Sequence, residues 1–294
     1  MGYLNMTDNS KNLRFAQQKF IDFLKKQGRA SATILAYGND IKQFVDFLTE
    51  EKKITQVTSV LPEHIEDFKK YLAEKKYIPK SISRKLNSIR TFFRFLLSQG
   101  VIKNNPASVV PHPHYEPAPP RILSKIEYRA LRDCARDDPR SAAIVEVLLQ
   151  TGMRVGELAR LTLDDIGDKE IKIAPYESNP GRTIPLNSAA KKALQRWLDF
   201  RPKTESKSVF ITKNGKPLPV RNIRALFNRL FKKAGIENAT INSLRHTFIA
   251  HQLMAGAPIE LIQKIVGHKR LSTTEKYLEM IKSQPQAINK LEEL

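Results

Sequence analysis

The sequence predicts a mainly α-helical protein of two domains, the second of which contains a small antiparallel β-sheet. Three observations support this prediction. Apolar residues recur at helical spacing through almost all of the first 105 residues. Six prolines then fall between residues 106 and 120, and proline disfavours both helix and sheet. After these prolines, two short alternating stretches, typical of strands, interrupt a segment that is otherwise patterned as helices.

The first domain, residues 11–105, is expected to hold four helices, at residues 11–27, 31–50, 62–76 and 80–99. The last helix has the most regular pattern, because its apolar residues step by four and three positions along one stripe. That stripe consists of Ile82, Leu86, Ile89, Phe93 and Leu97. Gly100 is expected to end this helix, since glycine is the usual residue of a left-handed C-cap.

An adjoining face of the same helix is polar and basic, with no acidic residue. At about 100° per residue, this face holds Lys80, Ser83, Arg84, Asn87, Arg90 and Arg94. A helix face that meets only solvent normally mixes charges of both signs. We therefore predict that Lys80, Arg84, Asn87, Arg90 and Arg94 contact the phosphates or a groove of a nucleic acid.

Residues 106–120 are predicted to form an extended linker rather than a packed element, because proline fixes φ and lacks a backbone donor. The two histidines of "HPH", His112 and His114, raise the question of a metal site. No further Cys, His or acidic cluster stands at ligand spacing, so no metal is predicted. Cys134 is the only cysteine, which excludes an intrachain disulfide.

The second domain, residues 121–282, is expected to begin with helices at 124–137 and 140–151, the first capped by Ser124. In "TGMRVGELARL", Arg154 follows a break that contains glycine and stands at the start of a further helix. There a guanidinium can bind an anion together with the amides of the helix N-terminus. A surface arginine is the alternative.

Strands are expected in "KEIKIAPY", residues 169–176, and "GRTIPL", residues 181–186, with the turn at Asn179, Pro180 and Gly181. Helical patterns then return at residues 188–200, 220–234, 242–255 and 258–266.

Charge indicates the class of partner. The chain has a net charge of +20 and a pI of about 10.0, which points to a polyanion. Residues 75–115 contain eight basic and no acidic residues, and residues 171–250 contain sixteen basic and four acidic ones. Basic clusters in both domains predict a clamp around nucleic acid. No apolar run approaches the roughly 18 residues of a membrane span, and no secretion signal is evident, so a cytoplasmic protein is expected.

Four separated motifs, "TGMRVGEL", "RTIPL", "SLRHTFIAHQL" and "VGHKRLSTTEKY", carry a family resemblance. Their order and approximate spacing are those of the tyrosine recombinase (phage integrase) family, and the chain resembles a compact Xer-like recombinase or a small integrase. The resemblance covers nearly the full length. It implies a SAM-like core-binding domain at 11–105 and a catalytic domain at 121–282, which together form a C-shaped clamp on duplex DNA.

The resemblance also implies a reaction. The Tyr277 hydroxyl would attack a DNA phosphodiester to form a 3′-phosphotyrosyl link, so that one strand exchange is split into two transfers. Arg154 and Arg245 would neutralise the charge of the transition state, His268 would donate a further hydrogen bond, and Arg182 of "RTIPL" would contact DNA. No metal or other cofactor is required. The expected assembly is a homotetramer on two DNA sites. An accessory protein is a further candidate partner.

Tyr277 itself is expected on a late helix that begins near Ser272, because Ser272 and Glu275 have capping-box spacing. The remaining tail, residues 283–294, reads by itself as an amphipathic end-helix or a frayed tail. The resemblance adds that it can be exchanged between protomers.

The chain departs from the family pattern at two places. Asn242 stands where many members have histidine, and asparagine cannot accept a proton at neutral pH, so general-base help must come from elsewhere or be dispensable. In the hairpin, Glu177 or Tyr176 stands where the family has a lysine that protonates the leaving oxygen; Lys172, Lys213 or Lys216 are the candidate substitutes. Two other functions therefore stay open: a DNA-binding protein that no longer cuts, and a type IB topoisomerase-like enzyme.

Overall fold

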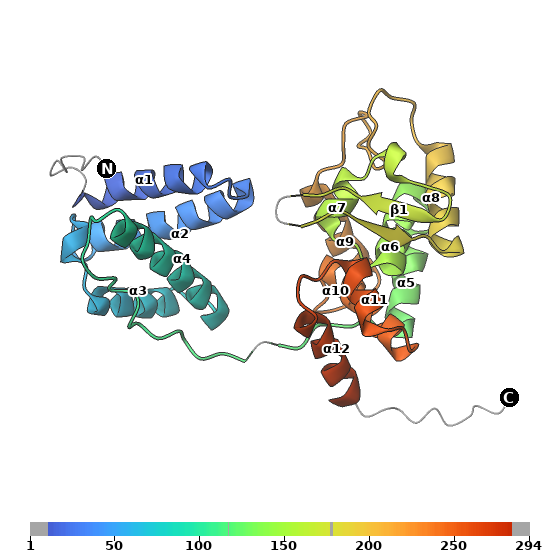
Figure 1. Cartoon of the computed structure of the whole chain (residues 1–294). Helices are drawn as coiled ribbons and strands as arrows, with labels where there is room; N and C mark the ends of the chain where they lie inside the picture. Colours follow the sequence, from blue (N-terminus) through green and yellow to red (C-terminus); the bar gives the residue numbers. More distant parts are fainter. Residues whose placement is uncertain (1–10, 117, 177–178, 284–294) are drawn as a thin grey trace. The chain divides into compact units, whose positions relative to one another are not determined.

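Helices make up most of the computed structural model, which describes residues 11–116, 118–176 and 179–283 (Figure 1). The chain divides into two units, Met1–Pro117 and Ala118–Leu294. The predicted fold class, mainly α with a small antiparallel sheet, is confirmed. The predicted tail exchange concerns residues 283–294, and residues 284–294 lie outside the described residues. None of the helices described is both long and apolar enough to cross a membrane.

The first unit contains the four helices that the sequence predicts. They are α1 (Leu13–Lys26), α2 (Ser31–Glu50), α3 (Pro62–Glu74) and α4 (Pro79–Ser98), with a short 3₁₀ turn η2 (Val57–Ser59) between α2 and α3. Aromatic residues dominate the core of this unit. Phe20 and Phe92 lie edge to face with ring centroids 5.4 Å apart, and Phe44 meets Phe68 at 5.1 Å. Such pairs add to the stabilisation that burial of the rings already provides.

The apolar stripe of α4 is confirmed at four of its five positions. Ile82, Leu86, Ile89 and Phe93 are buried, but Leu97 is 40% exposed, so its assignment to the core is wrong. At 100° per residue, the helix turns Leu97 toward the edge of the stripe by its last turn. Buried Leu96 lies on the core side there instead.

A buried carboxylate joins α2 to α4. Asp40 is 2% exposed and accepts hydrogen bonds from both terminal nitrogens of Arg84, from Lys85 Nζ at 3.0 Å and from Ser88 Oγ at 2.8 Å. A buried charge is tolerated when it is paired and hydrogen-bonded in this way. Arg84, predicted to contact DNA, therefore also pairs with an internal charge.

The first part of the proline-rich segment packs against α4, so the prediction of an unpacked linker is wrong there. Ala107 and Val110 are buried. Arg90 donates to the carbonyl oxygens of Ala107 and Val110, at 3.1 and 2.6 Å, and lies 2.7 Å from His112 Nε2. Lys69 Nζ donates to the carbonyl oxygen of Pro111 at 2.7 Å. Proline removes donors but leaves carbonyl acceptors, and these two basic side chains bind them.

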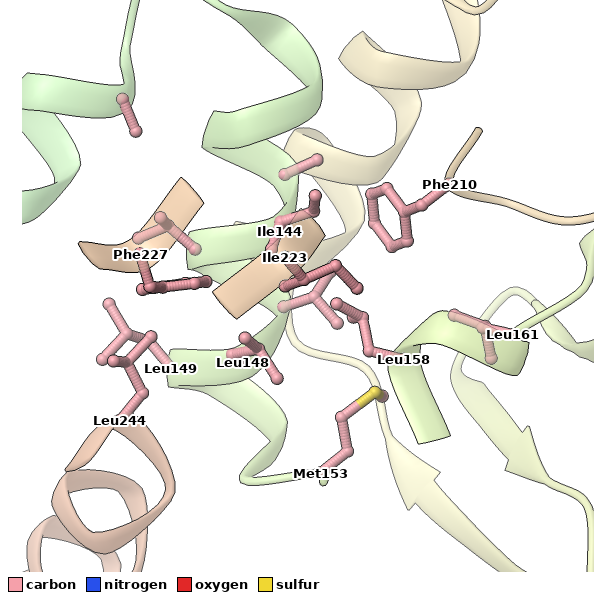
Figure 2. Packing of buried hydrophobic residues seen from close by; sticks show 14 of the residues in the cluster. Ile144, Leu148, Leu149, Met153, Leu158, Leu161, Phe210, Ile223, Phe227 and Leu244 are labelled. Atoms are coloured by element: carbon pink, nitrogen blue, oxygen red, sulfur yellow. The ribbon is translucent and has the colours of Figure 1, made fainter. Parts of the chain in front are cut away.

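The second unit is built around α6. Its elements are α5 (Lys125–Ala135), α6 (Pro139–Thr151), α7 (Val155–Arg160), η3 (Leu163–Asp165), β1 (Glu170–Ile173), β2 (Arg182–Pro185), α8 (Ser188–Phe200), α9 (Val220–Lys233), α10 (Ile241–Met254), α11 (Ile259–Val266) and α12 (Ser272–Ser283). Figure 2 shows Ile144 and Leu148 of α6 packed among Ile223 and Phe227 of α9 and Leu244 of α10. Helices from distant parts of the sequence thus share one core.

The predicted hairpin is present but shorter than expected. β1 and β2 are antiparallel, with Ile171 opposite Ile184 and Ile173 opposite Arg182. Ile171 and Ile173 are buried and Lys172 between them is exposed, as the alternation of a strand requires. Of the predicted hairpin residues, Glu177 lies outside the described residues.

Candidate active site

Two glycines at helix C-termini shape the site. Gly152 ends α6 with a φ of 58° and Gly267 ends α11 with a φ of 68°, the left-handed conformation that favours glycine. A Cβ on Gly152 would lie 2.4 Å from the ring of Phe248, and one on Gly267 would lie 3.1 Å from the Arg182 guanidinium. These turns leave the last carbonyl groups of α6 and α11 free to accept hydrogen bonds from side chains.

Arginine side chains donate hydrogen bonds to carbonyl groups at these two helix ends. Arg245 of α10 donates to the oxygens of Gly152, at 2.6 Å, and Val266, at 2.7 Å. Arg154, at the start of α7, donates to the oxygen of Gly267 at 2.7 Å. The negative ends of two helices thus hold cations from two other elements. Arg154 and Arg245, which stand 91 positions apart in the sequence, are brought to the same glycine-capped helix ends.

Glu157 connects the arginines and was not found by the sequence reasoning. It is 8% exposed and accepts from both terminal nitrogens of Arg182 at 2.8 Å, from the Arg154 side chain at 2.9 Å and from the Arg154 backbone at 2.8 Å. Burial raises the pKa of Glu157, but the hydrogen bonds and charges of the two arginines outweigh burial and lower the pKa to about 2. Its position three residues after Arg154, a capping-box spacing, is the signal that could have indicated it.

Arg182, for which the resemblance implies contact with DNA, lies inside this network. Its side chain is 10% exposed, donates twice to Glu157, and donates through Nε to the carbonyl oxygen of Ile265 at 2.6 Å. The reason is the hairpin register, which turns Arg182 to the same face as buried Ile173. Arg182 therefore positions Glu157, and through it Arg154.

Arg245 is the most buried of the three cations. It is 9% exposed, and burial together with the charge of Arg154 lowers its pKa to about 9. It remains charged at neutral pH. Among the described residues, Glu157 is the one carboxylate that pairs with these arginines, so the cluster carries an excess of positive charge. Such a cluster is suited to bind an anion, and a phosphodiester is an anion.

Tyr277 of α12 is buried beside this cluster, at 6% exposure. Its ring stacks on that of His268 with centroids 6.3 Å apart, and its hydroxyl lies 2.6 Å from Nδ1 of His246, the residue after Arg245. Burial raises the pKa of Tyr277, and the charge of Arg245 opposes that rise. The phenol is thus protonated at neutral pH. Sequence reasoning missed His246, although it stands beside Arg245 in the motif "SLRHTFIAHQL".

His268 is neutral at physiological pH. Burial and the charges of Arg245 and Arg154 lower its pKa to about 4. Its Nδ1 lies 2.9 Å from Oγ1 of Thr274, a fully buried residue on α12. When the Thr274 hydroxyl donates to Nδ1, Nε2 carries the ring proton and can donate to an anion.

Asn242 is not joined to the other predicted catalytic residues. It is exposed on the first turn of α10. In the part of the chain that the structure describes, its side chain forms no hydrogen bond. Asn242 is one helical turn from Arg245, so a ligand held by Arg245 could still reach it.

The three candidate lysines differ in their distance from the arginines. Lys213 lines a cavity of about 300 Å³ with Arg140, at the first turn of α6, and Thr212 donates its amide to the carbonyl oxygen of Lys216 at 2.8 Å. Arg140 is twelve residues before Gly152, or about 18 Å along a helix. Lys213 and Lys216 are therefore remote from the site.

Of the three candidates, Lys172 of β1 is the one beside the arginine network. It lines a cavity of about 280 Å³ with Glu157 and Tyr176. Tyr176, the second residue predicted at the lysine position, stacks on Arg160, whose guanidinium carbon lies 3.5 Å from the ring centroid. Lys172 projects from the face of the strand opposite Ile173, so it would have to turn toward a bound phosphate.

The basic face of α4 separates into two groups. Lys80, Arg84, Asn87 and Arg94 are exposed. Arg90 instead uses its guanidinium to hold residues 107–112 against α4. The structure thus gives Arg90 a packing role that the sequence did not suggest, and leaves the other four residues of the prediction exposed.

Sequence models of two protein families match the two units. Residues 121–284 match the one described as "Phage integrase family", and residues 18–100 match "Phage integrase, N-terminal SAM-like domain". The chain is 35% identical over 210 residues to "Tyrosine recombinase XerC" of Thermodesulfovibrio yellowstonii, covering 66% of this chain and 69% of that protein. It is 32% identical over 211 residues to "Tyrosine recombinase XerC" of Leptospira interrogans, covering 68% of each.

Solved structures give the same result for the fold. The crystal structure of XerA recombinase matches 93% of this chain and 99% of its own, with 27% identity and a TM-score of 0.53. A lambda integrase dimer bound to a COC′ core site matches 95% of this chain and 80% of its own, with a TM-score of 0.79. At 19% identity, the second likeness shows the fold alone.

Proposed function

This chain belongs to the tyrosine recombinase, or phage integrase, family, and we propose that it is a site-specific DNA recombinase acting through a 3′-phosphotyrosyl intermediate. The position of Tyr277 supports the proposal. Its hydroxyl lies in a buried site where helix C-termini hold Arg154 and Arg245. Among the described residues, Glu157 is the one carboxylate that pairs with the arginines of this site.

The proposed reaction uses these groups in one displacement at phosphorus. The Tyr277 oxygen forms a bond to the scissile phosphorus while the bond to the 5′-oxygen breaks, and the 5′-hydroxyl leaves with a proton. Negative charge grows on the non-bridging oxygens, where Arg154, Arg245 and the Nε2 proton of His268 stabilise it. Because their geometry is set before DNA binds, these groups need no reorganisation in the transition state.

Duplex DNA is the proposed partner of both units. The exposed residues Lys80, Arg84, Asn87 and Arg94 of α4 contribute from the first unit, and Arg154 and Arg245 bind the scissile phosphate in the second. One similar structure is that of a lambda integrase dimer on its core site. For this chain we propose a homotetramer on two DNA sites, a clamp made by both units, the domain limits 11–105 and 121–282, and exchange of the tail 283–294 between protomers.

The decisive experiment traps the covalent intermediate. Wild-type protein and Tyr277→Phe are each mixed with a library of random DNA duplexes, and protein-linked DNA is separated on a denaturing gel. Wild type should form an adduct whose sequenced ends give the site. Tyr277→Phe should form none, yet bind the recovered duplex within a few fold, because the ring keeps its packing against His268.

An adduct that persists in Tyr277→Phe would assign the chemistry to another residue. If wild type binds DNA but forms no adduct, the result would favour a DNA-binding protein that does not cut.

A further inference from the structure

The Tyr277 hydroxyl has a partner that the proposed reaction has not yet used. His246 Nδ1 lies 2.6 Å from it, and the two ring centroids are 5.9 Å apart. Within residues 11–116, 118–176 and 179–283, no other group hydrogen-bonds to this hydroxyl. The contact joins two helices, α10 and α12, at the atom that would attack phosphorus.

The place of His246 on α10 explains the contact. Successive residues of a helix point about 100° apart, so Arg245 and His246 face different neighbours. Arg245 turns toward the ends of α6 and α11, and His246 turns toward α12. His246 is half-buried, so part of the residue is exposed to solvent.

We propose that His246 is the proton acceptor for Tyr277 when DNA is cleaved. This inference rests on the proposed function. As the bond from the Tyr277 oxygen to phosphorus forms, the phenolic proton passes to His246 Nδ1, and the leaving 5′-oxygen takes a proton from water or from a nearby acid. In rejoining, the 5′-hydroxyl returns its proton to water or to that acid as its oxygen displaces the tyrosine, and His246 returns its proton to the phenolate.

The charges and burial around these two residues set the protonation states from which the transfer starts. The charged and titratable groups facing His246 are Arg245 on its own helix, Tyr277 on α12 and His268 after α11. Burial and the charge of Arg245 lower the pKa of His246, so the imidazole is neutral at pH 7 and has a lone pair to offer. Burial raises the pKa of Tyr277, so the phenol needs an acceptor.

Neighbouring groups are less suited to the role. His268 has its Nδ1 against Thr274 and its pKa is lowered to about 4, so it is a poor base. Asn242 is exposed, and an amide does not accept a proton at neutral pH. His246 thus provides the proton acceptor that asparagine at position 242 does not provide.

The test compares His246→Ala and His246→Gln with wild type in single-turnover adduct formation on the random duplex library. Glutamine can hold the Tyr277 hydroxyl by a hydrogen bond but cannot take its proton, so both variants should be slower by about 10²-fold or more. The wild-type rate should rise with pH and level off once His246 is neutral. In the variants it should continue to rise into the alkaline range, where Tyr277 ionises without help.

His251→Gln is the matched control. His251 lies on the same helix, and its ring packs against Tyr128 at 5.6 Å instead of against Tyr277. This variant should retain the wild-type rate and pH profile.

A wild-type rate and profile in His246→Gln, with or without a slow His246→Ala, would overturn the proposal in favour of positioning or of no role. Absence of the adduct in wild type would instead contradict the proposed function, whatever the variants do. Nitrogen NMR of the DNA-free protein gives a readout independent of activity and of the variants' folding. Nδ1 of His246 should be the unprotonated ring nitrogen, and a proton fixed on Nδ1 would overturn the assignment.

Discussion

Glu157 is the residue on which the arrangement of the arginines depends. It receives hydrogen bonds from Arg154 and Arg182, and neither arginine has another carboxylate partner among the described residues. A buried carboxylate between two cations is stable only while it is ionised. Its protonation state therefore couples the stability of the second unit to the geometry of the proposed phosphate site.

Acid should weaken the second unit through Glu157. Its pKa is about 2 in the folded protein against 4.5 for the free side chain, so its contribution is complete above pH 4.5 and is lost as pH falls toward 2. The contribution is about 3 kcal/mol at neutral pH. Urea unfolding followed at the second unit's transition should show Glu157→Gln destabilised at pH 7 but close to wild type near pH 2.

Asp164→Asn is the control for that measurement, because Asp164 pairs with Lys207 on the surface, where both side chains are more than 70% exposed. This pair should contribute almost nothing. Equal destabilisation of the Glu157 and Asp164 variants would contradict the role given to the buried carboxylate.

Lys172 is the residue expected to protonate the leaving oxygen. Lys172→Ala should cleave ordinary DNA more slowly by about 10² to 10⁴-fold, the usual value of proton donation. A substrate with sulfur in place of the 5′-bridging oxygen has a leaving group that needs no proton. It should restore the rate of Lys172→Ala, while wild type gains little.

Lys213→Ala provides the comparison, since Lys213 lies beside Arg140 at the far end of α6. It should behave as wild type on both substrates. Strong sulfur acceleration in wild type, unchanged by Lys172→Ala, would show that no lysine of the chain protonates the leaving group.

At the scale of elements, α4 has a packing role and a proposed DNA-binding role on different faces. Its exposed side presents Lys80, Asn87 and Arg94, and Arg90 binds the carbonyl groups of Ala107 and Val110. Ala107 and Val110, from the first part of the proline-rich segment, belong to the first unit's core. A basic residue on this helix cannot be assigned to DNA from its charge alone.

Single substitutions on α4 should separate these tasks. Arg94→Ala removes one proposed phosphate contact, so the slope of log affinity against log salt should become shallower by about one. Arg90→Ala should instead free residues 107–112, seen as faster amide exchange or proteolysis there. An unchanged slope in Arg94→Ala would mean that this face meets only solvent.

For the whole molecule, the net charge of +20 is divided between two units that each carry a basic cluster. Electrostatic attraction of this kind brings a protein to DNA without choosing a sequence. The proposed reaction at phosphorus is likewise shared by enzymes that relax DNA and enzymes that exchange strands. The outcome thus depends on assembly as much as on the site.

Plasmid substrates distinguish strand exchange from DNA relaxation. A supercoiled plasmid with two copies of the trapped site should be resolved into two circles, and a plasmid with one copy should keep its supercoils. Relaxation of the one-site plasmid would identify a topoisomerase-like enzyme. Tyr277→Phe should change neither plasmid, which excludes a contaminating nuclease.

By itself, the sequence determined the fold class and the helices, and it predicted the chemical set of Arg154, Arg245, His268 and Tyr277. Helices and strands follow from the local spacing of apolar residues, and the four chemical residues lie in short motifs whose order can be read along the chain. The same local information indicated the hairpin, though not its length.

Tertiary structure decided which side chains line the site and which support it by packing. Glu157 and His246 meet their partners across helices, Arg182 and Arg90 turn inward, and Leu97 turns outward. Contacts between elements far apart in sequence have no local period. Whether an arginine binds a carbonyl group or a phosphate depends on which helix end folds against it, and that is settled only when the elements pack.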